Sequence, residues 1–487
     1  MSGKMAAGSV SRREFGKLLG GAGAALLVPG AATGLKTGGP TETELKTGGP
    51  AEGDSRAKAL LHEQSPAPAR PFDFAQGRPD ENYWRSVRAQ FLLPPDLALM
   101  NAANLCPASA AVVNALDAQT RWVDRDPSMP NRRKMTEGRE ATRRLLAEFL
   151  RATPEEIVIT RNTSEGNNII SSGVDLKAGD EVLVFADNHP SLLNAWHEKA
   201  KRFGFTVRIV EQVNPHPGAD YYVDAFAKQM SARTKVVAFT HVTSTVGDLF
   251  PAKELCRLAR ERGVLSIVDG AQSFGVLDVD LSDMQPDFFT GSAHKWPCGP
   301  REVGVLYIRH AIAAVALGTP PSYPIAAAAL GTPAPAARPT VWPSIISLYP
   351  GAVGASRTFE AMGQRDEAAI IAFGEALKLQ TTIGRAAVER RSRELAQALI
   401  EGLKKIGGVK IWTHPEPARS AAIVSFQPGT LDGNRLATTL YEKDRIAVMA
   451  RGGADRGGLR VSPHFYNLHE EIDRTVGAIQ RYMRTGT

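Results

Sequence analysis

Short apolar runs rich in β-branched residues alternate with longer helical patterns through the middle of the chain. Near-continuous apolar runs are typical of parallel strands that are buried on both faces, because helices cover both sides of such a sheet. The pattern therefore predicts an α/β fold with a mostly parallel, seven-stranded sheet. The expected strands span residues 156–160, 181–185, 207–210, 235–239, 264–268, 288–290 and 303–308.

Polar residues follow several of these expected strands, at the end of a parallel sheet where ligands bind. After strand 156–160, Thr163 and Ser164 open a helical pattern. Hydroxyl groups at a helix start cap free N–H groups, and the same helix end attracts a phosphate. His189 follows strand 181–185 on a loop. Taken singly, these features do not define a site.

Two further strand ends carry stronger signals. Asp269 directly follows strand 264–268, and a buried carboxylate there needs a cationic partner such as a protonated pyridine nitrogen. Lys295 follows strand 288–290 between Ser292, His294 and an aromatic residue, and desolvation of such a lysine lowers its pKa and favours imine formation. A phosphate seat, an imidazole, an acid and an imine-forming lysine together match the needs of pyridoxal 5′-phosphate (PLP).

The spaced motifs D-G-A-Q at 269–272 and S-x-H-K at 292–295 resemble those of the class V aminotransferase family. That family belongs to the fold-type I group of PLP enzymes, with cysteine desulfurases, kynureninases and isopenicillin-N-epimerase-like proteins. The resemblance spans residues 83–483. It implies the PLP-dependent transferase fold, with a large sheet-containing domain and a smaller C-terminal α/β domain, and a homodimer with shared active sites.

The resemblance also implies a role for each motif residue. Lys295 would form the imine with the cofactor, Asp269 would pair with the pyridine nitrogen, and Gln272 would contact the phenolic oxygen. His189 would stack on the ring. The implied phosphate ligands are Thr163, Ser164, Ser292 and His294.

Four other positions take their expected roles from the same resemblance. Arg460 lies in an R-x-S segment whose arginine grips the substrate carboxylate, which a bidentate guanidinium suits, although a surface arginine opposing an acidic helix is the alternative. Asn101 lies in a stretch that lines the substrate pocket. Ser244 stands near the cofactor oxygen, where desulfurases have asparagine. Gln364 replaces a threonine that reaches the phosphate of the neighbouring subunit, which puts that hydroxyl contact in doubt.

The cysteines narrow the expected reaction. Desulfurases carry a nucleophilic cysteine before the C-terminal arginine, but no cysteine follows Cys298, so persulfide chemistry is not expected. We expect PLP-dependent Cα chemistry on a small amino acid or keto acid, by transamination or a related reaction. An isopenicillin-N-epimerase-like epimerase and a C–S or β-elimination lyase are the alternatives. An inactive PLP-binding scaffold and a cysteine hydrolase built on Cys106 are rivals from other classes.

Composition and charge exclude several other classes of protein. An apolar fraction of 43% is enough for a large core, so the 487-residue chain is not globally disordered. The net charge is +7, of which residues 1–34 hold +3, from four basic side chains and one acidic one. No basic run appears in the remainder, so we expect no nucleic-acid binding. The three cysteines are too far apart for a CxxC pair, and no metal site is expected.

The N-terminus has the pattern of an export signal. The sequence SRREFGK at 11–17 precedes a weakly hydrophobic run at 18–28 that is too short to span a bilayer, which takes about 20 apolar residues. The paired arginines resemble a twin-arginine signal, although a basic, disordered N-terminus is the alternative. We therefore expect a twin-arginine signal peptide at 1–34, export by the twin-arginine translocase to the periplasm or another extracytoplasmic side, and no stable membrane anchor.

Low-complexity segments predict the boundaries of the linker, the insertion and the domains. Residues 35–82 contain two copies of LKTGGP and few apolar residues, as in a disordered linker. A Pro/Ala-rich insertion is expected at 311–345. The predicted parts are an N-terminal segment at 83–110 packing on the small domain, a large PLP-binding domain at 111–360, and the small C-terminal domain at 361–487.

Overall fold

The computed structural model describes residues 79–310, 312, 341–345, 355–453 and 455–487. The expected signal peptide, most of the expected linker and most of the expected insertion lie outside these residues. The first described helix, α3 (Glu81–Arg88), begins after Asp80, which accepts a hydrogen bond from the Tyr83 N–H at 2.9 Å. At the end of the insertion, Val341 forms an antiparallel bridge with Val174. The signal peptide and the domain boundaries stay predictions.

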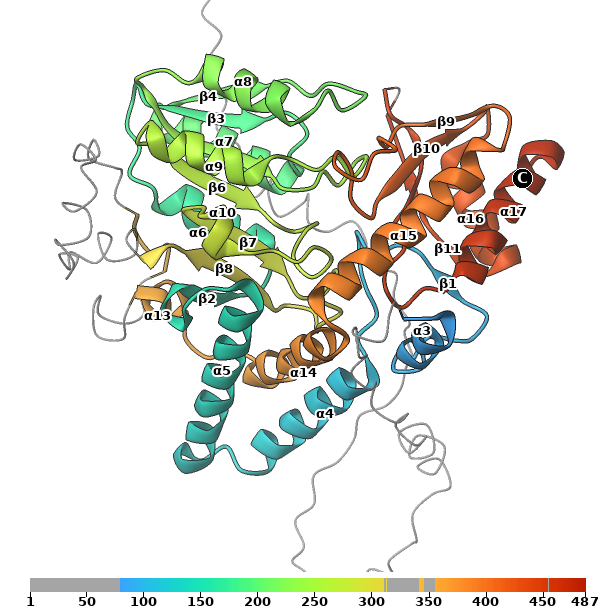
Figure 1. The fold of residues 1–487 in the computed structure, drawn as a ribbon. Helices are drawn as coiled ribbons and strands as arrows, with labels where there is room; N and C mark the ends of the chain where they lie inside the picture. Colours follow the sequence, from blue (N-terminus) through green and yellow to red (C-terminus); the bar gives the residue numbers. More distant parts are fainter. Residues whose placement is uncertain (1–78, 311, 313–340, 346–354, 454) are drawn as a thin grey trace, which may run out of the picture. The chain divides into compact units, whose positions relative to one another are not determined.

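One sheet contains all seven strands expected from the sequence, which confirms the α/β fold with a mostly parallel sheet (Figure 1). Its strand order is β2-β8-β7-β6-β5-β3-β4, and β8 runs antiparallel to both of its neighbours. The other neighbouring pairs are parallel. The strands are β2 (Ile157–Thr160), β3 (Glu181–Phe185), β4 (Thr206–Val210), β5 (Thr234–Thr240), β6 (Leu265–Asp269), β7 (Phe288–Ser292) and β8 (Gly304–Ile308).

Both faces of this sheet are buried along its inner strands. Along β3, Val182 and Val184 belong to one hydrophobic cluster, whereas Leu183 and Phe185 belong to another. Successive side chains of a strand point to opposite faces, so the uninterrupted apolar run reflects burial on both sides. The helices around the sheet are α4 (Ala110–Arg125), α5 (Met129–Leu150), α6 (Thr163–Gly173), α7 (Pro190–Phe203), α8 (Ala219–Gln229), α9 (Ala252–Glu261), α10 (Leu281–Met284), α13 (Ala355–Glu360) and α14 (Glu367–Ile383).

A second, smaller sheet lies in the C-terminal part of the chain (Figure 1). It is antiparallel, with the order β12-β13-β10-β9, and a third hydrophobic cluster packs against it. Its strands are β9 (Val409–Ile411), β10 (Val424–Pro428), β12 (Met449–Arg451) and β13 (Gly458–Val461), and its helices are α15 (Arg385–Lys404), α16 (Gly433–Asp444) and α17 (His469–Thr485). The N-terminal strand β1 (Ala98–Leu99) joins this part by pairing with β11 (Ile446–Ala447) in parallel.

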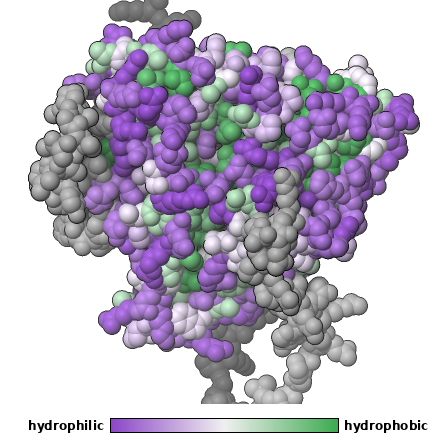
Figure 2. Space-filling view, viewed as in Figure 1, coloured by the Kyte–Doolittle hydropathy of each residue, from purple (hydrophilic) through white to green (hydrophobic). Residues whose placement is uncertain are grey.

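The face of the molecule seen in Figure 2 is mostly hydrophilic, with small hydrophobic patches between polar residues. Exposed large hydrophobic side chains such as Leu92, Met129 and Tyr441 come from separate elements. Scattered apolar side chains of this kind are normal on a protein surface. Across the described ranges, we find no helix with the length and hydropathy needed to cross a membrane.

Candidate active site

A cavity of about 350 Å³ lies where the parallel strands of the large sheet end. Ligands of parallel α/β sheets bind at this edge. The cavity brings together ten of the twelve site residues expected from the sequence. They are Thr163, Ser164, His189, Ser244, Asp269, Gln272, Ser292, His294, Lys295 and Arg460.

The start of α6 forms one wall of the cavity. Asn162 caps this helix by accepting a hydrogen bond from the Glu165 N–H at 3.0 Å. The hydroxyl groups of Thr163 and Ser292 lie 2.8 Å apart, and the Thr163 N–H donates to the Ser292 hydroxyl at 2.9 Å. Gly304 permits this close packing, because a Cβ there would lie 2.8 Å from the Asn162 Cα. A helix N-terminus lined by hydroxyl groups is suited to an anion.

Asp269, at the end of β6, is buried and is held by two hydrogen bonds. Its carboxylate accepts one from the Asn167 side chain and one from the Ala271 N–H, each at 2.9 Å. The Thr290 hydroxyl in turn donates to the Asn167 side-chain oxygen at 3.0 Å. Asn167 was not among the site residues expected from the sequence, because its role depends on a contact between α6 and β6.

The backbone around Lys295 is fixed from two directions. The Cys298 N–H donates to the Lys295 carbonyl, and the Cys106 N–H donates to the His294 carbonyl, both at 2.9 Å. Because Cys106 lies before α4, the second bond ties the lysine loop to the N-terminal segment. The loop is therefore anchored on both sides of the lysine.

Trp296, next to the lysine, is held by three side chains. Its carbonyl accepts hydrogen bonds from Gln380 and His464, both at 2.7 Å, and its indole N–H donates to the Gln272 side-chain oxygen at 2.8 Å. The Gln272 amide also donates to the Ala103 carbonyl at 2.9 Å. Gln272 therefore lines the cavity while both ends of its amide bind other parts of the protein.

Burial sets the protonation of the groups in the cavity. Desolvation, and to a smaller extent the positive charge of Arg460, lowers the pKa of Lys295 to about 8. Desolvation and the nearby lysine lower the pKa of His294 to about 4, and they also lower the pKa of His189. The His189 Nδ1 accepts a hydrogen bond from the Ser191 N–H at 3.2 Å, as only an unprotonated nitrogen can. Both imidazoles are therefore neutral near pH 7.

Arg460 projects from β13 and is only 4% exposed. It donates to the Ser244 carbonyl at 2.8 Å, but its Nε has no partner, and within the described ranges it forms no ion pair. Desolvation, together with the positive charge of Arg451, lowers the pKa of Arg460 to about 10. A buried guanidinium without a carboxylate partner is suited to binding an anionic ligand.

Two expected site residues lie outside the cavity. Asn101 forms a bridge with Ser462, and its side-chain oxygen is buried without a partner among the residues described here. Its neighbours at 103 and 104 line the cavity instead. Gln364 contacts Arg132 and Glu367 in another part of the surface, so the single chain does not bring it to Lys295.

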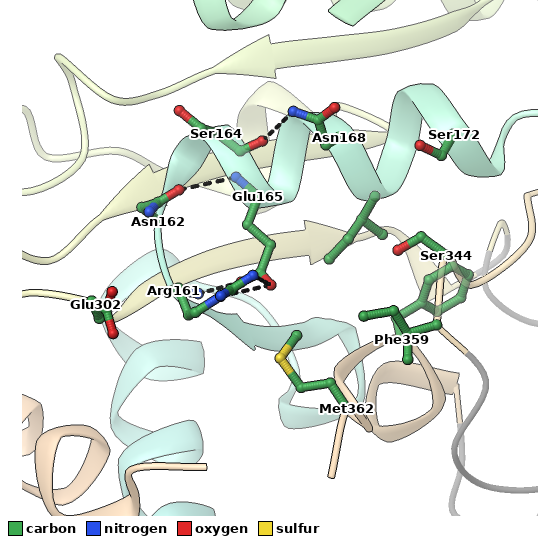
Figure 3. A pocket seen from close by; sticks show the side chains of 12 residues that line it. Arg161, Asn162, Ser164, Glu165, Asn168, Ser172, Glu302, Ser344, Phe359 and Met362 are labelled. Carbon is green, nitrogen blue, oxygen red and sulfur yellow. Dashed lines mark hydrogen bonds and ion pairs between the residues drawn. The ribbon is translucent and has the colours of Figure 1, made fainter. Parts of the chain in front are cut away.

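A second cavity, of about 460 Å³, shares Asn162 and Ser164 with the first (Figure 3). Figure 3 shows Arg161 and Glu165 joined side by side at this cavity. Their ion pair has an N–O distance of 3.0 Å. The positive charge of Arg161 is therefore already neutralised, unlike that of Arg460. We assign no chemistry to this second cavity.

The fold is that of the fold-type I PLP enzymes. A C-DES variant solved with glycine covalently linked to its PLP cofactor matches with a TM-score of 0.68 at 23% identity, over 81% of this chain and 98% of that chain. The sequence profile described as aminotransferase class-V matches residues 109–322 and 347–475. The chain therefore belongs to the class V aminotransferase family, a family of PLP-dependent enzymes.

Two curated relatives cover most of the chain. Isopenicillin N epimerase of Amycolatopsis lactamdurans is 31% identical over 402 residues, which are 82% of this chain and 98% of that protein. A probable cysteine desulfurase of Pyrococcus abyssi is 28% identical over 364 residues, which are 72% of this chain and 84% of that protein. The similarity thus includes two different reaction types.

The groups of the cavity fit PLP in their chemistry. The hydroxyl-lined start of α6 suits a phosphate, and the buried Asp269 forms no ion pair within the described part of the chain. The Lys295 Nζ forms no hydrogen bond or ion pair with another described residue, which leaves the amine available. Phosphate binding would fall to Thr163, Ser164, Ser292 and His294.

Proposed function

We propose that this chain is a PLP-dependent enzyme that removes the α-proton of an amino acid and returns a proton to the same carbon, as an amino-acid epimerase does. The observation that carries the proposal is one cavity with three complementary groups. These are Lys295 with its lowered pKa, the buried carboxylate of Asp269, and Arg460, which lacks a carboxylate partner.

Each group has a defined task. When bound, PLP supplies an electron sink for the negative charge that develops at the α-carbon. Arg460 binds the substrate carboxylate and orients the α-carbon. Asp269 keeps a proton on the ring nitrogen, because a buried carboxylate stabilises a positive charge beside it. Lys295 Nζ, whose pKa is about 8, accepts the α-proton as a neutral amine.

The cysteines favour epimerisation over desulfuration. All three are buried, and none of them lines the cavity. Burial also raises the pKa of the Cys298 and Cys256 thiols, which opposes thiolate formation. The isopenicillin N epimerase similarity supports the epimerase outcome, and the desulfurase similarity keeps C–S lysis as the alternative. Transamination, expected first from the sequence, has no specific support from these relatives.

Hydrogen exchange in D₂O tests the proposal. Purified, PLP-loaded protein is incubated with single-enantiomer amino acids, and proton NMR and chiral chromatography follow the α-proton and the configuration. We expect deuterium at the α-carbon together with the opposite enantiomer. Exchange without inversion would overturn the epimerase outcome. Accumulation of a keto acid would favour transamination, and the absence of exchange with every amino acid would favour an inactive scaffold.

We also propose that residues 1–34 direct export through the twin-arginine translocase and that the enzyme works as a homodimer. The paired Arg12 and Arg13 support the first proposal, and family membership supports the second. Cell fractionation of the full chain and of an Arg12→Lys/Arg13→Lys variant tests export, and we expect the variant to stay in the cytoplasm. Sedimentation equilibrium of the purified enzyme tests the dimer, with a monomer mass as the contradicting outcome.

A further inference from the structure

The smaller sheet presents two arginines to the cavity. In the antiparallel pair β12–β13, Arg460 lies opposite Met449, and Arg451 lies two residues further along β12. Residues two apart on a strand share a face, and diagonal neighbours of this kind lie about 7–8 Å apart. Arg451, Met449 and Arg460 accordingly all line the same cavity. The second arginine was absent from the sequence expectations, because the resemblance assigns a role to only one.

Neither guanidinium is neutralised by the protein where the structure describes it. The Arg460 side chain donates a hydrogen bond to the Ser244 carbonyl, and the Arg451 side chain forms no hydrogen bond or ion pair with a described residue. Asp187, whose charge acts on Arg451, is already bound by Arg456 at 3.0 and 3.3 Å. The two arginines are therefore positive charges available to a ligand.

Burial distinguishes Arg451 from an ordinary surface arginine. The side chain is half-buried, and desolvation lowers its pKa, as it does for Arg460. A solvated surface arginine would keep its hydration and an unperturbed pKa. Two desolvated guanidinium groups in one cavity repel each other, and bound anions relieve that repulsion.

We propose that the substrate of this enzyme is an amino acid with a second carboxylate on its side chain, which Arg451 binds while Arg460 binds the α-carboxylate. This inference rests on the proposed function for the identity of the reacting amino acid. It names the substrate class that the proposed function leaves open. Two bidentate guanidinium sites at a fixed spacing select both the charge and the length of such a ligand.

Calorimetry with acids that lack an amine measures binding to the two arginines separately from the reaction. Glutarate and butyrate are titrated into the PLP-loaded wild type, Arg451→Gln and Arg451→Lys. We expect glutarate to bind the wild type about tenfold more tightly than butyrate, an advantage that Arg451→Gln abolishes and Arg451→Lys partly keeps. An equal affinity for the two acids in the wild type, or an advantage unchanged in Arg451→Gln, would overturn the proposal.

Substrate pairs extend the test to turnover. The KM for L-glutamate should rise about tenfold in Arg451→Gln, whereas the KM for L-norvaline, which lacks the second carboxylate, should not change. Arg257→Gln is the matched control, because Arg257 is exposed on α9 and pairs with Glu261. An equal rise for both amino acids would contradict the proposal.

The two tests separate the failure of this inference from the failure of the proposed function. A glutarate advantage that depends on Arg451, without α-proton exchange on any amino acid, would keep the dicarboxylate site and reject the proposed reaction. Exchange on monocarboxylic amino acids without a glutarate advantage would keep the proposed reaction and reject the dicarboxylate site.

Discussion

The lysine side and the arginine side of the cavity differ in how their polar groups are partnered. On the lysine side, the backbone around Lys295 and the side chains of Asp269 and Gln272 are fixed by hydrogen bonds from several elements. On the arginine side, Arg460 has a single carbonyl partner and Arg451 has none in the described residues. The polar groups of the first side are therefore held mainly by the protein, whereas those of the second side are not.

This contrast indicates which part of the site is preorganised for its ligand. A satisfied hydrogen-bond network holds its side chains in one geometry, as a resident cofactor requires. Unpaired guanidinium groups keep their donors for a ligand that enters and leaves. We therefore expect substitutions on the lysine side to affect cofactor and reaction together, and substitutions on the arginine side to affect substrate binding alone.

Lys295→Ala should have the largest effect. Removal of the proposed general base should lower the rate of α-proton exchange by about 10²–10⁴-fold, the usual contribution of such a group. NMR of exchange in D₂O measures it, and circular dichroism checks the fold. Lys199→Ala is the matched control, because burial lowers the Lys199 pKa to about 8 as well, yet Lys199 binds Asn168 outside the cavity. Equal losses in both variants would contradict the assignment.

Arg460→Gln should have the second-largest effect, and it should impair substrate binding. Loss of a charge-assisted, partly bidentate contact should lower kcat/KM by about a hundredfold, while PLP binds as in the wild type. Steady-state kinetics and the visible absorption of the bound cofactor measure the two quantities. A parallel loss of PLP would break the contrast between the two sides.

Asn167→Ala should have a smaller effect, and it should act on the lysine side. It removes one of the two hydrogen bonds to the buried Asp269, which is worth about 1.5–3 kcal/mol for a charged group. We expect PLP affinity to fall about tenfold and the visible band of the bound cofactor to shift. Asn168→Ala, at an exposed neighbouring position, should leave both unchanged. If the band does not move while stability falls, Asn167 serves the fold alone.

An effect of similar size is expected in the pH dependence of cofactor uptake. The folded pKa of Lys295 is about 8, below its ordinary value of 10.5, so the reactive neutral amine predominates above pH 8 and is lost as the pH falls through it. Uptake of PLP by the cofactor-free protein should therefore rise about tenfold from pH 7 to pH 9. Stopped-flow absorbance measures the rate. A midpoint near 10.5 would show that the lysine is solvated.

The large sheet was predictable because its strands are mostly apolar, and polar residues at their ends located Asp269 and Lys295. The smaller sheet was not, because its strands are three to five residues long and give little periodic signal. Arg451 stands on one of these strands, and its relation to Arg460 appears only in the β12–β13 register. Asn167 likewise requires a tertiary contact that no local pattern reports.

The resemblance placed Asn101 beside the cavity and not on its wall. Asn101 pairs with Ser462 and leaves the cavity wall to the next residues along the chain. Gln364 stands where the family has a threonine that reaches the neighbouring subunit, so its role stays a prediction that a single chain does not test. Short motifs transfer a role between relatives, whereas the exact residue that lines a cavity depends on local backbone geometry.

The contact between the N-terminal segment and β13 has a consequence for biosynthesis. The Ala103 N–H donates to the Ser462 hydroxyl at 3.1 Å across 359 positions of sequence, and β1 pairs with β11. A ribosome makes the chain from its N-terminus, so the segment at 98–104 emerges long before its partners exist. The nascent large sheet can assemble earlier, but the cofactor cavity gains its last wall only when translation is almost complete.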